Sequence, residues 1–204
     1  MRLRAFRLGA AVASVLAVSG IPQAYVLSGH YWGTSSVNYF VNPVNGEMSQ
    51  QAATASLQAA AANWYEQSGA NVRFVYAGQA LGTSLQNNGK NEVFFRNAST
   101  GSTGAATYWW YGSTGKLLDA DIIIYDASFK FFPGSSGCSG GFHLEDLTTH
   151  EFGHALGMQH STVASATMYP TSSTWCSQTT YYSRIAAKNP AGSTSGPIWK
   201  FTTA

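Results

Sequence analysis

Three of the five histidines in this 204-residue chain fall within one short stretch, HEFGHALGMQHS at 150–161. His150 and His154 are four residues apart, so in a helix their side chains lie on one face, one turn apart, and both can reach one metal ion. Gly157 permits a left-handed turn at the end of this helix, after which His160 returns from another direction. Three neutral nitrogen ligands with one open position are typical of catalytic rather than structural zinc.

Glu151 is placed to do chemistry beside such a metal. It is rotated by about 100° from His150 around the helix, so it flanks the metal-facing side without displacing a ligand. A carboxylate there can accept a proton from a water molecule on the metal and later donate it, which is general acid–base catalysis. The competing interpretation is a buried helix that is rich in histidine by coincidence.

A helix over 49–68 is predicted in the first half of the chain. It begins after Ser49, a residue suited to cap a helix, and Gly69 ends it. Apolar residues recur at helical spacing on one face, which is expected to be buried. These residues are Leu57, Ala60, Ala61 and Trp64.

Strands are predicted where aromatic and β-branched residues gather between Gly, Asn or Ser. These runs are 36–41, 71–78, 91–97, 106–111 and 117–126, with a hairpin connection at 112–115. A Gly- and Ser-rich loop over 131–142 precedes a second helix over 144–157, whose first turn carries Glu145 and Asp146. The order of strand, helix, several strands and helix predicts an α+β fold rather than regular βαβ alternation.

The extended pattern H-E-x-x-H-x-x-G-x-x-H resembles that of metzincin zinc metalloproteases. SATMYPT, which carries Met168, resembles their Met-turn, and Ser161 after the third histidine is similar to the matrixin branch. The resemblance covers roughly 35–177. It implies a twisted mixed β-sheet with two main helices, the zinc helix being followed by the Met-turn.

The resemblance also implies roles for individual residues. His150, His154 and His160 would bind one catalytic Zn²⁺, and Glu151 would be the catalytic base. Met168 would be a hydrophobic support beneath the metal, and Gly157 a structural support at the turn. Tyr169 is not expected to be a ligand, because the family's metal-reaching tyrosine lies two positions beyond the methionine, where this chain has Pro170.

The composition favours a secreted protein. Charged residues make up 10% of the chain and the net charge is +2, too small to indicate nucleic acid as a partner. MRLRAFR followed by LGAAVASVLAVSG has the basic-then-apolar order of a secretory signal peptide, predicted over 1–24, and the apolar run is too short to span a bilayer. A buried N-terminal helix is the alternative. No membrane association is expected after signal removal.

Cys138 and Cys176 are the two cysteines, and in an exported chain an even number suggests one disulfide. Such a bond would close a loop of 39 residues around the histidine cluster. It would contribute about 3–4 kcal/mol in the chain-entropy model. Two free thiols are the alternative. Neither cysteine lies upstream of the domain, so latency through a pro-segment cysteine, usual in animal matrixins, is not expected.

Three further candidate sites, for a second zinc ion, for calcium and for carbohydrate, are poorly supported by the sequence. Only His30 and His143 remain outside the cluster, too few for the second, structural zinc of matrixins. Calcium could bind the acids of DADIIIYD, but no clear motif supports it, and strand-end hydrogen bonds are the preferred role for Asp119 and Asp121. For the adjacent Trp109 and Trp110, one ring packing inward is preferred over a carbohydrate-stacking surface.

The last part of the chain, 178–204, departs from the matrixin pattern. A matrixin-like domain, predicted over 25–177, should continue into a closing C-terminal helix. Here alternating residues, a turn at NPAGSTSG and the strand-like PIWKFTT resemble the last two strands of a fibronectin type III module. A helix over 177–188 is the competing interpretation.

Taken together, these features predict a secreted, extracellular, monomeric zinc endopeptidase. Its partner would be a protein or peptide substrate that adds a strand to a sheet edge above the zinc helix. The alternative is a catalytically weak binding or adhesion protein with a metzincin-like fold. The altered C-terminus motivates this alternative, whereas the presence of Glu151 argues against it.

Overall fold

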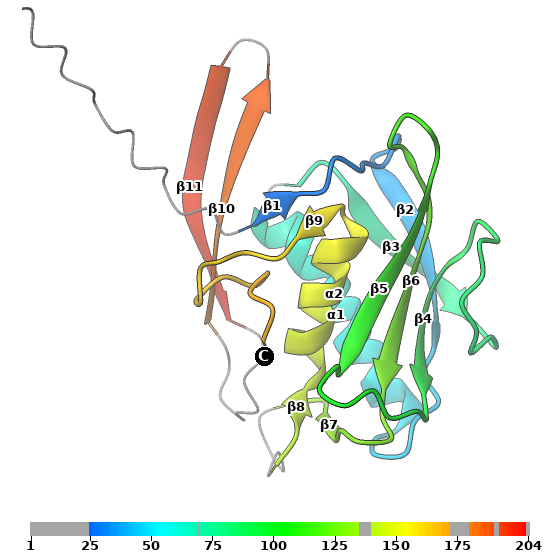
Figure 1. The fold of residues 1–204 in the computed structure, drawn as a ribbon. Helices are drawn as coiled ribbons and strands as arrows, with labels where there is room; N and C mark the ends of the chain where they lie inside the picture. The colour runs from blue at the N-terminus through cyan, green and yellow to red at the C-terminus, as the bar shows by residue number, and fades with distance from the viewer. Residues whose placement is uncertain (1–24, 69, 135–139, 172–179, 190–191, 203–204) are drawn as a thin grey trace, which may run out of the picture.

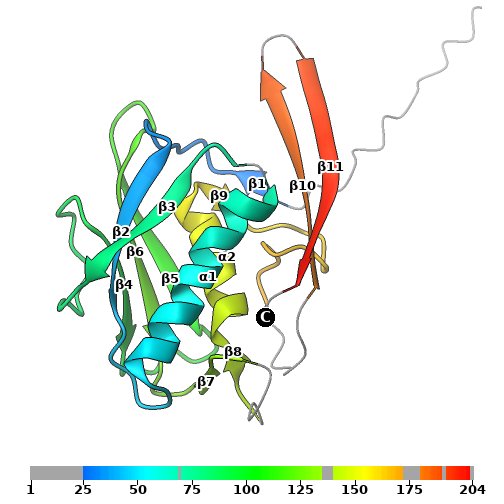
Figure 2. The ribbon, with the colours of Figure 1, turned by 180° about the vertical axis from the view of Figure 1, so that it is seen from behind.

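A computed structural model describes residues 25–68, 70–134 and 140–171, together with the backbone of 180–189 and 192–202. Two helices cover one face of a five-stranded sheet, the arrangement expected of an α+β fold (Figures 1 and 2). The strand order is β3-β2-β4-β6-β5. The strands are β2 (Ser36–Asn42), β3 (Arg73–Gln79), β4 (Asn91–Arg96), β5 (Ala105–Tyr111) and β6 (Leu117–Tyr125).

The sheet is mixed, as predicted. β2 runs parallel to β3 and β4, and β4 runs parallel to β6. β5 is antiparallel to β6 and lies at one edge of the sheet. The predicted hairpin connection is confirmed: the Gly112 N–H donates to the Lys116 carbonyl at 2.9 Å, and Gly115 has φ +82°.

Helix α1 (Gln50–Ser68) confirms the first predicted helix. Ser49 caps it, its Oγ accepting the Ala52 N–H at 3.2 Å. All four residues of the predicted apolar face are buried, with exposed fractions of 2% or less. Burying such side chains contributes roughly 1.5–3 kcal/mol for a leucine-sized group. Gly69, the predicted end of this helix, lies outside the described residues.

Helix α2 (Leu144–Ala155) confirms the second helix and ends two residues before the predicted Gly157. The last turn closes with the Leu156 N–H bonded to the Phe152 carbonyl and the Gly157 N–H bonded to the His154 carbonyl. Phe152 anchors the helix to the sheet, its ring centroid lying 5.2 Å from that of Tyr39 and 5.1 Å from that of Phe74. α2 also packs along α1 and β5, so it is held on both sides (Figure 1).

The loop that precedes β4 is held by two buried carboxylates of β6. Asp119 Oδ2 accepts the N–H groups of Asn88 and Gly89, each at 2.8 Å. Asp121 accepts the Gln86 N–H at 3.1 Å and the Glu92 N–H at 2.9 Å. Burial raises the pKa of Asp121 to about 6. Hydrogen bonding to the backbone is thus the role both carboxylates have in the fold.

Four strands of two residues each were not predicted from the sequence. β1 (Val26–Leu27) pairs antiparallel with β9 (Met158–Gln159), and β7 (Phe131–Phe132) pairs parallel with β8 (Phe142–His143). β1 belongs to a segment, residues 25–33, that we call the N-terminal strap. The strap crosses the C-terminal end of α2 (Figure 1).

Hydrogen bonds fix the N-terminal strap to this helix end. Ser28 donates to the Gly157 carbonyl through both its N–H, at 2.9 Å, and its hydroxyl, at 2.7 Å. Trp32 Nε1 donates to the Ala155 carbonyl at 2.8 Å. The carbonyls at a helix end lack partners within the helix, so the strap satisfies groups that would otherwise need water.

The C-terminal part forms a hairpin of β10 (Thr180–Asn189) and β11 (Gly192–Thr202). The strands pair antiparallel, with an irregularity between Arg184 and Ala186. The prediction of strands is confirmed, and the competing helix over 177–188 is not formed from 180 onward. The hairpin lies on the helix side of the molecule, away from the sheet (Figures 1 and 2). Its likeness to a fibronectin type III module stays a prediction.

Several predictions fall outside the described residues. These are the signal peptide over 1–24 and the pairing of Cys138 with Cys176. No helix in the described part of the chain is long and apolar enough to cross a membrane.

Candidate metal centre and active site

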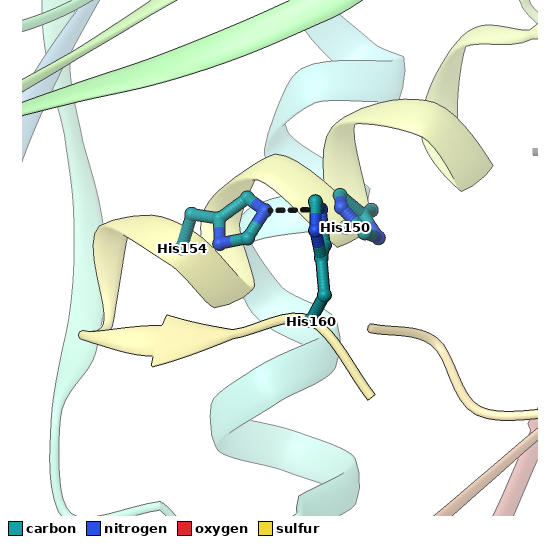
Figure 3. Close-up of side chains that lie close together, drawn as sticks. All are labelled: His150, His154 and His160. Carbon is teal, nitrogen blue, oxygen red and sulfur yellow. Dashed lines mark hydrogen bonds between the residues drawn. The ribbon is translucent and has the colours of Figure 1, made fainter. Parts of the chain in front are cut away.

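Three histidine side chains converge at the C-terminal half of α2 (Figure 3). His150 and His154 come from the helix, and His160 comes from the segment after β9. Their candidate ligand atoms all lie within 4.8 Å of one another. His150 is buried, His154 is half-buried and His160 is exposed, so the group opens to solvent on the His160 side.

The hydrogen bonds of the rings leave nitrogen lone pairs facing one another. His150 Nδ1 lies 2.7 Å from the Thr167 carbonyl, and His154 Nδ1 lies 2.7 Å from the Met158 carbonyl. A carbonyl only accepts, so Nδ1 carries the hydrogen in both rings, and Nε2 keeps the lone pair that can bind a cation. Carbonyl partners of this kind orient histidines that bind metals.

The spacing of these nitrogens suits zinc. His154 Nε2 and His160 Nε2 are 3.2 Å apart. Tetrahedral zinc with Zn–N distances of about 2.0–2.1 Å would place neighbouring ligand nitrogens about 3.3 Å apart. Three imidazoles without a fourth protein ligand leave one position open for water or substrate.

Burial keeps two of the rings in the neutral form that binds metals. Desolvation, together with the neighbouring His154 and His160, lowers the pKa of His150 to about 4. Desolvation is also the main cause that lowers the pKa of His154. Neutral imidazole is the ligand form, so at neutral pH no proton has to leave these rings before a cation enters.

The turn around Met168 supports the site from below. Met168 is fully buried. Its carbonyl accepts the Ser161 N–H at 2.7 Å, which ties the turn to the residue after His160. The neighbouring Thr167 carbonyl is the partner of His150. One turn therefore holds two of the three histidines.

Glu151 lies beside the histidine group in a buried position. Its side chain is 4% exposed, and burial raises the pKa of its carboxyl to about 7. The Thr107 hydroxyl of β5 lies 2.7 Å from Glu151 Oε2 and opposes part of this rise. Thr107 was missed by the sequence analysis. The sequence feature that could have indicated it is that Thr107 is a hydroxyl residue within ATYWWY, a strand that is otherwise apolar and aromatic.

A cleft of about 510 Å³ runs between β5 and the histidine group. Glu151, His154 and His160 contribute to its lining, together with Thr107 and Trp109 of β5. Val26 of the N-terminal strap also lines it. The cleft therefore brings together two of the three proposed ligands, the carboxyl of Glu151 and an edge strand.

Trp109 packs inward, as preferred in the sequence analysis. It contacts the hydrophobic core, and its ring lies edge-on to those of His154 and His30, with centroids 6.3 and 5.5 Å away. His30 in turn stacks on Tyr111 at 3.8 Å. Within the described residues, the histidine cluster is the one group of three or more His, Cys, Asp or Glu side chains that could hold a metal ion.

The sequence pattern of the matrixin family matches residues 31–184, three quarters of the chain. The chain belongs to the matrixin family. This membership and the histidine group agree with the metzincin-like fold predicted from the sequence. The matched range also continues into the start of β10.

Three relatives have similar sequences. Karilysin of Tannerella forsythia is 25% identical over 150 residues, which are 72% of this chain and 30% of karilysin. Matrix metalloproteinase-20 of Homo sapiens is 49% identical over 47 residues, 23% of this chain and 9% of that protein. The hatching enzyme of Paracentrotus lividus is 53% identical over 36 residues, 18% of this chain and 6% of the enzyme. This matrixin thus spans under a third of the length of each relative.

Proposed function

We propose that this matrixin is a secreted, zinc-dependent endopeptidase. One observation carries the proposal: three histidine ligand atoms lie within 4.8 Å of one another beside a buried carboxyl. Membership of the matrixin family supports it, as does the word metalloproteinase in the name of one relative.

In this proposal His150, His154 and His160 hold one zinc ion, and Met168 and Gly157 support the turns that present them. Zinc, when bound, supplies Lewis acidity that polarises a peptide carbonyl and makes water a better nucleophile. Glu151 accepts one proton from the attacking water and donates it to the leaving peptide nitrogen. The raised pKa of its carboxyl, about 7, suits a group that must both take and give a proton near neutral pH.

The substrate would bind along β5. This strand ends the sheet order, so within the described residues its outer edge has no strand partner. An extended peptide can form backbone hydrogen bonds to such an edge. It would then lie in the cleft above α2, with its scissile bond facing Glu151.

Cleavage of casein by wild-type protein and by Glu151→Gln tests the proposal. Glutamine keeps the shape of the side chain but cannot serve as a base, so we expect the rate to fall by about 100-fold or more. Zinc content should remain at the wild-type level, because the ligands are intact. Cleavage that survives both Glu151→Gln and a chelator would refute the proposal.

A second candidate function is a catalytically weak binding or adhesion protein. The β10–β11 hairpin favours it, because strands occupy the part of the chain where a matrixin-like domain would have its closing helix. One zinc ion per chain with no turnover of any member of a peptide library would support this function over the protease.

We also propose that 1–24 directs export and that Cys138 and Cys176 form a disulfide. Both proposals rest on the sequence. An intact mass of the secreted protein that begins near Tyr25, and is 2 Da below that of the reduced chain, would agree with them. A mass that includes residues 1–24, or free thiols, would contradict them.

A further inference from the structure

Thr107 reaches from the sheet to the carboxyl group of the proposed base. Its Oγ1 lies 2.7 Å from Glu151 Oε2 and 3.0 Å from the Glu151 carbonyl oxygen. Thr107 belongs to the edge strand β5, where it pairs with Ile122 of β6. The contact therefore joins residues 44 positions apart in the chain.

The position of this hydroxyl is well fixed. Threonine is branched at Cβ, which restricts its χ1 angle, and the β5–β6 pairing holds its backbone. The hydroxyl has one hydrogen to donate, and both acceptors within reach, Oε2 and the carbonyl oxygen, belong to Glu151. Whichever of the two it bonds, the hydroxyl stays in contact with Glu151. A glutamate side chain otherwise has three rotatable bonds, and a displacement of about 1 Å at a reacting group can cost about 100-fold in rate.

We propose that Thr107 is a positioning residue that holds the Glu151 carboxyl in the orientation needed to act on water. The proposal rests on the proposed function of Glu151. Thr107 contacts the Glu151 carboxyl, and it is not proposed to contact the attacking water or the scissile bond. Its hydroxyl acts by selecting one arrangement of the carboxyl in the cleft.

A purely structural role is the competing explanation, because the bond to the Glu151 carbonyl also ties β5 to α2. Variants separate the two roles. Thr107→Val keeps the shape and removes the hydroxyl, whereas Thr107→Ser keeps the hydroxyl and removes the methyl group. Thr148→Val is the matched control: the buried Thr148 hydroxyl bonds the Leu144 carbonyl at 2.7 Å within the same helix and does not reach the carboxyl of Glu151.

The experiment measures kcat, KM, melting temperature and zinc content on one peptide substrate. We expect Thr107→Val to lower kcat by about 10- to 100-fold, the effect of losing one hydrogen bond to a charged group. KM should stay within about twofold, because the lost bond does not contact the substrate. Thr107→Ser should recover most of kcat. Thr148→Val should lower the melting temperature and leave kcat unchanged.

Wild-type kcat in folded, zinc-loaded Thr107→Val would overturn the proposal, as would a loss that Thr107→Ser fails to recover. Should the valine variant not fold, Thr107→Ala provides the same comparison with Thr107→Ser. Glu151→Gln is measured in parallel. Full activity of Glu151→Gln would show that the proposed function itself has failed, whereas its inactivity beside an active Thr107→Val would reject Thr107 alone.

Discussion

Among single residues, two glycines determine how closely neighbouring segments approach α2 and the turn that follows it. A Cβ atom on Gly153 would lie 2.3 Å from Met168 Sδ and 2.8 Å from Trp64 Cζ2. A Cβ atom on Gly157 would lie 2.3 Å from the His30 carbonyl oxygen, and Gly157 has φ +94°. The Met168 turn can therefore contact α2, and the N-terminal strap the turn after it, only because these two positions lack a side chain.

Gly157→Ala should weaken both folding and metal binding. Alanine at a positive φ costs about 1–3 kcal/mol, and the His30 carbonyl must also move away. His160 follows three residues later, so its ring should shift out of the group. We expect a lower urea midpoint and weaker zinc binding in titrations. Gly46→Ala is the control, because its Cβ would meet nothing within 4 Å; equal effects of the two variants would contradict this account.

At the scale of elements, the N-terminal strap connects the end of α2 to β9. Ser28 and Trp32 together bond two of the last carbonyls of the α2 region, while β1 pairs with the strand that leads into His160. The strap thus positions His160 although it lies more than 100 residues away in sequence.

Removing the side-chain hydrogen bonds of Ser28 and Trp32 should loosen the metal site. Ser28→Ala and Trp32→Phe should each lower the free energy of unfolding by about 1 kcal/mol, and more where a buried carbonyl is left without a partner. Zinc should also dissociate faster from both variants. Thr34→Ala is the control, because Thr34 is exposed and its hydroxyl bonds only nearby Ser36. Zinc release at the wild-type rate from Ser28→Ala and Trp32→Phe would be inconsistent with a positioning role for the strap.

The start of α2 gives a prediction about pH. His143 Nδ1 lies 3.2 Å from Asp146 Oδ1, and the hydrogen bond to Asp146 is the main cause that raises the pKa of His143. A pKa raised in the folded state means that the stabilisation is complete below the unfolded value, about 6.5, and is lost as pH rises through the folded value.

His143→Asn should therefore lower the melting temperature more at pH 5.5 than at pH 9. The difference between the variant and the wild type is the quantity to compare, because it removes the titration of other groups. Melting curves followed by circular dichroism at the two pH values provide the measurement. A difference that grows toward pH 9 would mean that the ion pair does not stabilise α2.

The long elements could be predicted from the sequence because their signals are local. The apolar face of α1, its Ser49 cap and the aromatic runs of the sheet each lie within a few neighbouring residues. The two-residue strands β1 and β9 were missed because a pair of residues has no periodicity. Thr107 was missed for a different reason: its contact with Glu151 depends on which strand packs beside α2, and that is a long-range property of the fold.

At the level of the whole molecule, the short motif at 150–160 depends on contacts from the sheet, from α1, from the N-terminal strap and from the Met168 turn. The sheet supplies β5, whose Thr107 contacts Glu151. Helix α1 packs against α2, and its Trp64 Nε1 donates to the Thr149 carbonyl at 2.7 Å. The N-terminal strap and the Met168 turn contact the other sides of the site. The convergence of His150, His154 and His160 could be anticipated from their spacing. The burial that makes the first two rings neutral and raises the pKa of Glu151 is a property of the packed layers.

We expect His150, His154 and His160 to hold one zinc ion that the proteolytic activity requires. The most direct measurement removes metal with a chelator, dialyses the chelator away, and follows casein cleavage and bound metal as zinc is added back. We expect no cleavage without metal, full recovery at one zinc per chain, and no recovery at that ratio in His154→Ala. Full cleavage by the metal-free protein, or one tightly bound zinc in His154→Ala, would contradict it.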